Sequence, residues 1–160
     1  MEVYYNNKIL KDDDFLRVKC VQEEPKIILN TNPNKLYTLI KYDPDAVNGT
    51  MIHWAIINIT NNDIESGNII IPYKGPAPPS KSGKHRYIFN LYEQDRYIFV
   101  DPINERQMEL DKLKDKLNLV VPIFNIKFIS ENESGGKTKR KTKRKTKRKK
   151  NKKLNRTRRY

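Results

Sequence analysis

Charge is divided unevenly along this chain, and that division limits which part can fold. Of the 33 Lys and Arg residues in the 160-residue sequence, 16 lie in residues 137–160, which have no Asp or Glu. Residues 1–136 are left with 17 basic and 19 acidic side chains, so the overall charge of +14 belongs to the C-terminal segment. Like charges repel, and the segment has almost nothing apolar to bury. We therefore expect a globular body with a disordered basic tail.

A polar stretch that ends in two glycines separates these two parts. Residues 130–136 read Ser-Glu-Asn-Glu-Ser-Gly-Gly, which is typical of a flexible linker. We predict one domain over residues 1–129, a linker over 130–136 and a disordered polybasic tail over 137–160. A domain of this size can bury a core without help from metals or disulfides, and Cys20, as the only cysteine, cannot form an internal disulfide.

Apolar runs in this sequence are too short for a membrane span. A span needs about 18 consecutive apolar residues, and none is present. The first ten residues also lack the apolar run of a secretion signal. We therefore expect no transmembrane segment and a location in the cytoplasm. Asn, Ile and Lys together make up 58 of the 160 residues, a bias that suggests an AT-rich genome such as that of a large DNA virus. In that case the location is the host cytoplasm, with the virion or the nucleus as alternatives.

Short clusters of Ile, Tyr and Phe, bounded by Asn, Asp, Gly and Pro, predict a mostly β domain. The run from Ile52 to Ile59 is largely apolar on both alternating faces, which indicates a central strand that is covered on both sides. The strands that we predict span residues 27–29, 36–42, 52–59, 69–71, 87–92 and 123–128.

One segment has the periodicity of a helix. Leu110, Leu113 and Leu117 fall on one helical face with charged residues between them. We predict a helix that begins with Asn104 as its N-cap and ends at Leu117. Many strands with one late helix favour a β-sandwich or barrel with a peripheral helix.

The two histidines lie where turn-rich segments meet predicted strands. His53 follows the Asp-Pro-Asp sequence at residues 43–45, and His85 follows a proline-rich segment at residues 75–79. Proline fixes the backbone and removes its own N–H, so the segment should be a stiff loop that directs its few donors. Such a loop beside two histidines is a way to build an anion pocket.

Other readings of these residues remain open. A single histidine is more often a structural residue than a ligand. A metal site could be assembled from His53, His85 and scattered Asp residues, but the sequence has no metal-binding spacing motif. A serine hydrolase could use Ser80 or Ser82 as its nucleophile, but neither serine lies in a G-x-S-x-G motif. A weak hydrolase that uses His85 and an Asp-activated water is a further alternative. We expect no enzymatic activity, no metal and no cofactor.

Five sequence blocks in order carry a resemblance to a known family. This pattern resembles the phosphatidylethanolamine-binding protein (PEBP) family, most densely over residues 36–94 and more weakly over 117–124. The blocks are residues 43–46 (DPDA), 53–59 (HWAIINI), 62–67 (NDIESG), 73–79 (YKGPAPP) and 83–89 (GKHRYIF).

The resemblance implies a PEBP-like β-sandwich with one or two peripheral helices and a small surface cavity that binds phosphate groups, lipid headgroups or phosphorylated side chains. In such a cavity both imidazoles would donate to phosphate oxygens. Family members act as regulators by binding proteins, so a protein partner is also expected. The expected function is non-enzymatic binding of an anion or phosphate headgroup, with a regulatory role. The ligand-binding residues that the resemblance implies are Asp43, Asp45, His53, Ala77, Pro78, Pro79, His85 and Tyr87.

The basic tail has several readings of its own. It can be a solvated extension, a nuclear-targeting signal, a nonspecific nucleic-acid-binding segment or an attachment to an anionic membrane surface. The alternative function is therefore a nucleic-acid-associated protein, in one version packaged in a virion. The side chains that would contact nucleic acid or an anionic surface are Lys137, Lys139, Arg140, Lys141, Lys143, Arg144, Lys145, Lys147 and Arg148.

Overall fold

The computed structural model describes residues 1–132, and within this part of the chain nine strands form two sheets. The smaller sheet has the order β2-β1-β4 and the larger sheet the order β3-β9-β8-β5-β6-β7. All neighbouring pairs are antiparallel except β3 and β9. The strands are β1 (Glu2–Tyr5), β2 (Lys8–Ile9), β3 (Asp14–Phe15), β4 (Lys26–Ile28), β5 (Leu36–Asp43), β6 (Met51–Ile59), β7 (Asn68–Ile71), β8 (Lys84–Gln94) and β9 (Phe124–Glu131).

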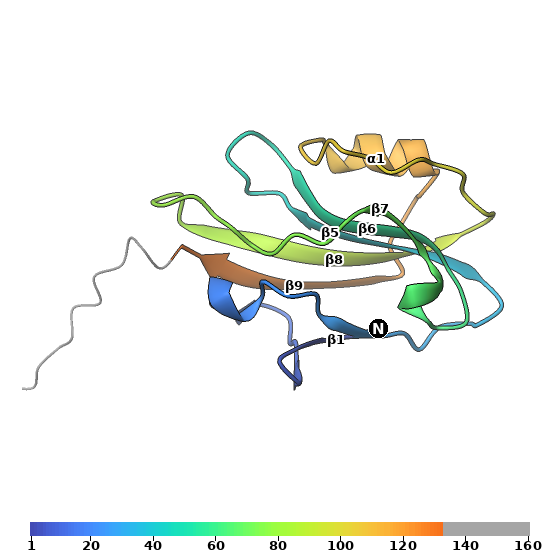
Figure 1. Ribbon diagram of the computed structural model, residues 1–160, viewed down its shortest axis with the longest axis horizontal. Coiled ribbons are helices and arrows are strands. Elements are labelled where there is room, and N and C mark those ends of the chain that lie inside the picture. The colour runs from blue at the N-terminus through green and yellow to red at the C-terminus, as the bar shows by residue number, and fades with distance from the viewer. Residues whose placement is uncertain (133–160) are drawn as a thin grey trace, which may run out of the picture.

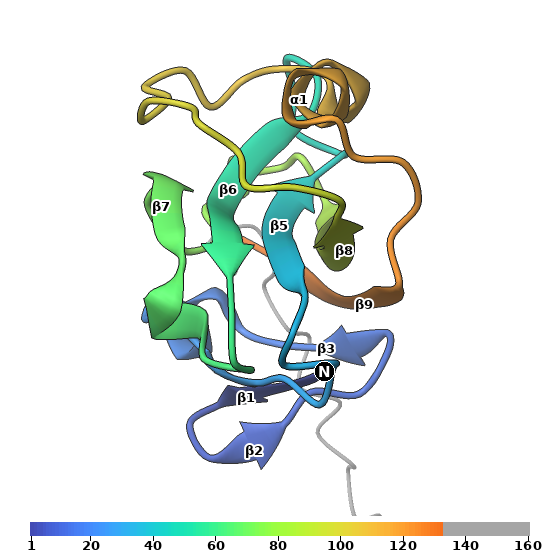
Figure 2. The same ribbon diagram turned by 90° about the vertical axis from the view of Figure 1, so that its right-hand side faces the viewer.

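The large sheet is covered on both faces (Figure 1 and Figure 2). One face packs against the small sheet, and the other against the helix α1 (Leu110–Leu117) and the segment that leads to it. Two short 3₁₀ turns, η1 (Val18–Cys20) and η2 (Ile64–Ser66), complete the described elements. The predicted mostly β fold with a peripheral helix is confirmed. The sheets do not close into a barrel, because β3 and β7 remain the edges of the larger one.

Strand β6 shows why both faces need cover. Trp54 and Ile56 pack into the core beneath the small sheet, while Ala55 and Ile57 pack into the core beneath α1. Successive side chains of a strand point to opposite faces, so an apolar run becomes a strand that is buried on both sides. The prediction of a central, doubly covered strand is confirmed, and all six predicted strands are present with small shifts of their ends.

The N-terminal hairpin was not predicted. Val3 and Tyr5 of β1 are buried, while the intervening Tyr4 is more exposed. Asn6 and Asn7 follow with φ values of 50° and 62°, the backbone of a two-residue hairpin turn. The two asparagines that directly follow residues 2–5 were the sequence signal that could have predicted this hairpin.

The predicted start of the helix is wrong. The helix begins at Leu110 rather than after Asn104, and Glu109 precedes it without a side-chain cap. The residues between are held extended: Ile103 N–H donates to Ile70, the Arg106 carbonyl accepts from Ile52, and Met108 N–H donates to Thr50. These backbone bonds to β7 and to the start of β6 replace the bonds of a first helical turn. Leu113 and Leu117 are buried, as the leucine stripe predicts.

Strand β9 extends to Glu131, two residues past the predicted domain boundary at residue 129. Ser130 and Glu131 therefore belong to the strand rather than to the linker, and Ser130 pairs with His85 of β8. The remainder of the predicted linker from residue 133 and the predicted tail over 137–160 lie outside the described residues. Over residues 1–132 no helix is both long and apolar enough to cross a membrane.

Candidate functional site

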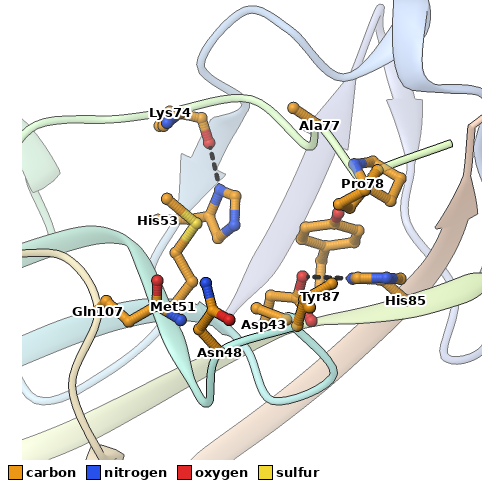
Figure 3. Close-up of a pocket in the computed structure, with 13 residues that line it drawn as sticks. Asp43, Asn48, Met51, His53, Lys74, Ala77, Pro78, His85, Tyr87 and Gln107 are labelled. Atoms are coloured by element: carbon orange, nitrogen blue, oxygen red, sulfur yellow. Dashed lines mark hydrogen bonds and ion pairs between the residues drawn. The ribbon is translucent and has the colours of Figure 1, made fainter. Parts of the chain in front are cut away.

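The candidate site lies at one end of the large sheet, where three neighbouring strands bring polar side chains together (Figure 3). Strand β5 ends in Asp43, β6 carries His53 near its start, and β8 carries His85 and Tyr87. Because β5 lies between β6 and β8, these side chains border one cavity of about 200 Å³. The cavity is lined by Asp43, Ala46, Val47, Asn48, Met51, His53, Lys74, Ala77, Pro78, Pro79, His85, Tyr87 and Gln107.

The proline-rich loop walls the cavity and is attached to the body of the domain. Lys74 N–H donates to the His53 carbonyl at 2.8 Å, Gln22 donates to the Pro76 carbonyl at 2.9 Å, and Asn132 donates to the Pro78 carbonyl at 3.0 Å. Gly75 permits this closeness, because a Cβ at that position would lie 2.8 Å from the Cα of Gln22. The loop is therefore stiff and anchored.

His85 sits in a continuous chain of hydrogen bonds. Its Nδ1 lies 2.8 Å from the Asp43 carboxylate, and its Nε2 lies 2.8 Å from the Ser82 hydroxyl. The Ser82 hydroxyl in turn lies 2.8 Å from the Pro79 carbonyl, which can only accept. Both ring nitrogens of His85 therefore have a hydrogen-bond partner within the protein.

His53 has a different environment. Its Nδ1 lies 2.9 Å from the Lys74 carbonyl, so Nδ1 carries the hydrogen and donates. Burial lowers the pKa of His53 to about 4, and the nearby Lys41, Lys74 and Arg106 also lower it, against the opposing effect of the bond to the Lys74 carbonyl. At neutral pH the ring is therefore uncharged and Nε2 is a hydrogen-bond acceptor. No side chain or backbone group within residues 1–132 bonds to this buried nitrogen.

Tyr87 brings a second unsatisfied group to the cavity. Its side chain is fully buried, with the ring edge-to-face on His53 at 5.2 Å and stacked on Phe128 at 5.2 Å. Its hydroxyl finds no partner of adequate hydrogen-bond geometry among the described residues, although the Ala77 backbone is near enough to act on its pKa. Burial raises that pKa, and Asp43 adds to the rise, so the hydroxyl keeps its proton. A buried group without a partner is costly, which indicates an external one.

Seven of the eight residues predicted as ligand-binding line the cavity, and the eighth, Asp45, does not. The Asp45 carboxylate instead pairs with the side chain and backbone N–H of Arg86 at 2.7–2.9 Å, and this lowers its pKa. Asp45 N–H donates to Asp43 Oδ1 at 2.8 Å. Asp45 therefore holds the turn that carries Asp43 and does not line the cavity, and its role in ligand binding stays a prediction.

Three polar lining residues, Asn48, Lys74 and Gln107, are not among the predicted ligand-binding residues. Lys74 precedes the glycine of the proline-rich loop, and its place inside the matched block at residues 73–79 was the available signal. Gln107 enters the cavity because the extended segment before α1 bridges to Met51. Nothing in the local sequence around Gln107 signals that bridge. Over the described residues, no cluster of three His, Cys, Asp or Glu side chains could hold a metal ion.

Two packed sheets with a small cavity, walled by an anchored proline-rich loop, define a β-sandwich with a pocket at one end of its larger sheet. The chain belongs to the phosphatidylethanolamine-binding protein family: residues 6–122 match the family model described as "Phosphatidylethanolamine-binding protein".

Individual relatives agree with this family and this fold. A Drosophila melanogaster protein named "Putative odorant-binding protein A5" is 32% identical over 111 residues, which cover 66% of this chain and 51% of that protein. The chain thus spans about half the length of that relative. Among solved structures, the carboxypeptidase Y inhibitor in complex with its cognate proteinase superposes with a TM-score of 0.69 at 20% identity over 82% of each chain. A Plasmodium vivax phosphatidylethanolamine-binding protein gives 0.66 at 15% identity, over 82% of this chain and 84% of that one. At these identities the superpositions show the fold alone.

Proposed function

We propose that this protein binds a phosphate-type anion in the cavity between the two histidines, as a binding module rather than an enzyme. The observation that carries the proposal is the pair of buried, unpartnered polar groups at the cavity, His53 Nε2 and the Tyr87 hydroxyl. A bound anion that carries one hydroxyl group and one further acceptor oxygen would satisfy both. The size of the cavity supports a small group, because about 200 Å³ holds a phosphate but not a lipid chain.

Charge around the cavity supports an anion. Lys74 lines it, and Arg106 is close enough to His53 to lower that residue's pKa. Asp43 is the one carboxylate in the lining, and it is already bonded to His85 and to the Asp45 backbone. With Asp43 engaged in these bonds, the cationic side chains of Lys74 and Arg106 favour a negatively charged ligand.

The proposal predicts a loss of affinity when the hydroxyl of Tyr87 is removed. Tyr87→Phe deletes an oxygen that has no hydrogen-bond partner among residues 1–132, so the fold should be retained, with a free energy of unfolding equal to or above that of the wild type. Affinity for inorganic phosphate and for phosphoethanolamine, measured by isothermal titration calorimetry, should fall about tenfold, since one hydrogen bond to a charged group is lost.

Tyr97→Phe is the matched control, because Tyr97 is about half exposed and its hydroxyl bonds Asn68 outside the cavity. Its affinity for phosphate should equal that of the wild type. Equal phosphate affinity for Tyr87→Phe and the wild type, or no phosphate binding by either, would refute the proposal.

A second candidate function rests on the basic composition of residues 137–160. Sixteen positive charges without an acid favour a nucleic-acid-associated role, in which the tail neutralises phosphates and affinity falls steeply with salt. Deleting residues 137–160 separates the two candidates in the same calorimetric experiment. Phosphate binding should survive the deletion if the cavity is responsible, whereas binding of random-sequence nucleic acid should be lost with the tail.

A further inference from the structure

The two unpartnered groups at the cavity differ in hydrogen-bonding character, and that difference is informative. His53 Nδ1 is committed to the Lys74 carbonyl at 2.9 Å, so the free nitrogen, Nε2, offers a lone pair and no hydrogen. The Tyr87 hydroxyl, in contrast, can donate. A ligand that satisfies both must therefore bring one hydrogen-bond donor and one acceptor. Figure 3 shows the Nδ1 edge of His53 turned to Lys74 and the rest of the ring turned toward the cavity.

The surroundings of His53 oppose a second proton on its ring. The side chain is 2% exposed, and the charged groups that act on it come from three directions: Lys41 on β5, Lys74 on the loop after β7, and Arg106 on the segment before α1. Each of the three lowers the pKa of His53 and so disfavours an imidazolium. Across the cavity, Asp43 is bonded to His85 rather than to His53. Tyr87 faces the ring edge-to-face and keeps its proton.

We propose that the cavity selects phosphate groups that carry an acidic proton, which means phosphate monoesters and inorganic phosphate, and discriminates against sulfate and phosphodiesters. This inference rests on the proposed function of the same cavity. The P–OH of a singly protonated phosphate donates to His53 Nε2, and a second, unprotonated oxygen accepts from the Tyr87 hydroxyl. Lys74 compensates the remaining negative charge.

Sulfate and phosphodiesters present only acceptor oxygens to this pair. One of those oxygens would face the lone pair of Nε2, so the nitrogen would remain unsatisfied and electrostatic repulsion would be added. The diester class includes the linkage of a phospholipid headgroup. The cavity therefore fits a terminal phosphate group rather than a phosphate that links two groups.

A charge-matched pair of small ligands tests the inference. At pH 5.5 methyl phosphate is mainly a monoanion that carries one proton, since the second pKa of a phosphate monoester lies near 6. Dimethyl phosphate has the same charge and no proton. Calorimetry on the wild-type chain should give an affinity for methyl phosphate about 10- to 100-fold above those for dimethyl phosphate and sulfate. Raising the pH to 8 should weaken methyl phosphate binding about tenfold or more, because the ligand loses its proton.

His53→Asn supplies the matched variant. An asparagine amide at this position can still donate to the Lys74 carbonyl but has no group in the place of Nε2. In this variant the ratio of the affinity for methyl phosphate to the affinity for dimethyl phosphate should fall to about 1.

The outcomes separate the two claims. Equal affinities of the wild type for methyl phosphate, dimethyl phosphate and sulfate would overturn the inference and leave the proposed anion site standing. The same holds if glycerophosphoethanolamine binds more tightly than methyl phosphate, since its ammonium would then be the donor to Nε2 and a lipid headgroup the ligand. Absence of binding by all four ligands at both pH values would overturn both claims.

Discussion

Replacing Lys41 with methionine should raise the free energy of unfolding at pH 7 by about 1–4 kcal/mol, the range seen when buried ion pairs give way to apolar residues of similar volume. Lys41 lies in the middle of β5 and is 0% exposed. No carboxylate within residues 1–132 forms an ion pair with it, and burial lowers its pKa well below the usual value.

Aromatic rings offset part of this cost. The Lys41 Nζ lies 4.2 Å from the ring centre of Tyr73 and 5.5–5.9 Å from those of four further aromatic residues. A desolvated cation–π contact contributes about 2 kcal/mol, which is less than the several kcal/mol needed to bury an ammonium. The amine also donates to the Tyr73 and Tyr5 hydroxyls at 2.9 and 3.2 Å. Those hydroxyls keep partners without it, because they bond each other and Tyr73 donates to the Val21 carbonyl.

The sign of the pH dependence gives this prediction a second readout. The pKa of Lys41 is lower in the folded chain than in the unfolded one, so the unfolded chain binds more protons in the interval between the two values. The stability of the wild type therefore rises with pH toward about 10.4, the pKa of an unperturbed lysine. The advantage of Lys41→Met over the wild type should shrink between pH 7 and pH 10.

Urea denaturation of both chains measures the effect, and Lys116→Met on the exposed face of α1 is the control, with an expected change within about 0.5 kcal/mol. A loss of stability in Lys41→Met at pH 7 would show that the aromatic contacts outweigh the cost of burial, contrary to this account.

Gly67→Ala should lower the free energy of unfolding by about 3 kcal/mol, at the upper end of the usual cost of overpacking. A Cβ at Gly67 would lie 2.5 Å from Ile56 Cγ2, 2.8 Å from Ile59 Cγ1 and 2.9 Å from the Ile57 carbonyl oxygen. The last of these is backbone of the central strand β6 and cannot yield without disturbing the sheet. The φ of Gly67 is −79°, so the cost is steric crowding rather than backbone conformation.

Gly83→Ala provides the comparison. Gly83 has a φ of +82°, and the position of a Cβ there is surrounded by open space. Alanine at this position therefore costs only the free energy of placing an L-residue at a positive φ, about 1–2 kcal/mol. Thermal and urea unfolding of the two variants should rank Gly67→Ala as the less stable. The reverse ranking would contradict the tight packing of η2 and β7 on β6.

Much of the large sheet could be predicted from the sequence, because its strands are unusually rich in Ile, Tyr and Phe and are separated by clear turn residues. The start of the helix could not. The leucine spacing is the same whether residues 104–109 coil or run extended, and backbone bonds to Ile70, Ile52 and Thr50 decide it. Those bonds depend on the position of a strand that is more than thirty residues away in sequence.

Most of the cavity lining was predicted from the sequence, but the hydrogen bonds of its two histidines were not. The motif order located Asp43, His53, the proline-rich loop, His85 and Tyr87, and the expectation that both imidazoles donate to a phosphate followed from residue type alone. Hydrogen-bond partners assign the two rings different roles. Asp43 and Ser82 occupy both nitrogens of His85, while the Lys74 carbonyl turns the free nitrogen of His53 into an acceptor. Which carbonyl a ring faces depends on how the loop packs, and the sequence does not encode that locally.

The most direct test of the anion site is a phosphate titration followed by long-range ¹H–¹⁵N NMR of the imidazoles at pH 6.5. His53 and His85 are the only histidines, so a single substitution assigns both spectra. We expect the free protein to show His53 protonated at Nδ1 alone, and phosphate to shift the resonances of both rings along one saturable curve with a single Kd. Resonances of both rings that stay unmoved at saturating phosphate, or that respond with different midpoints, would contradict a shared phosphate site.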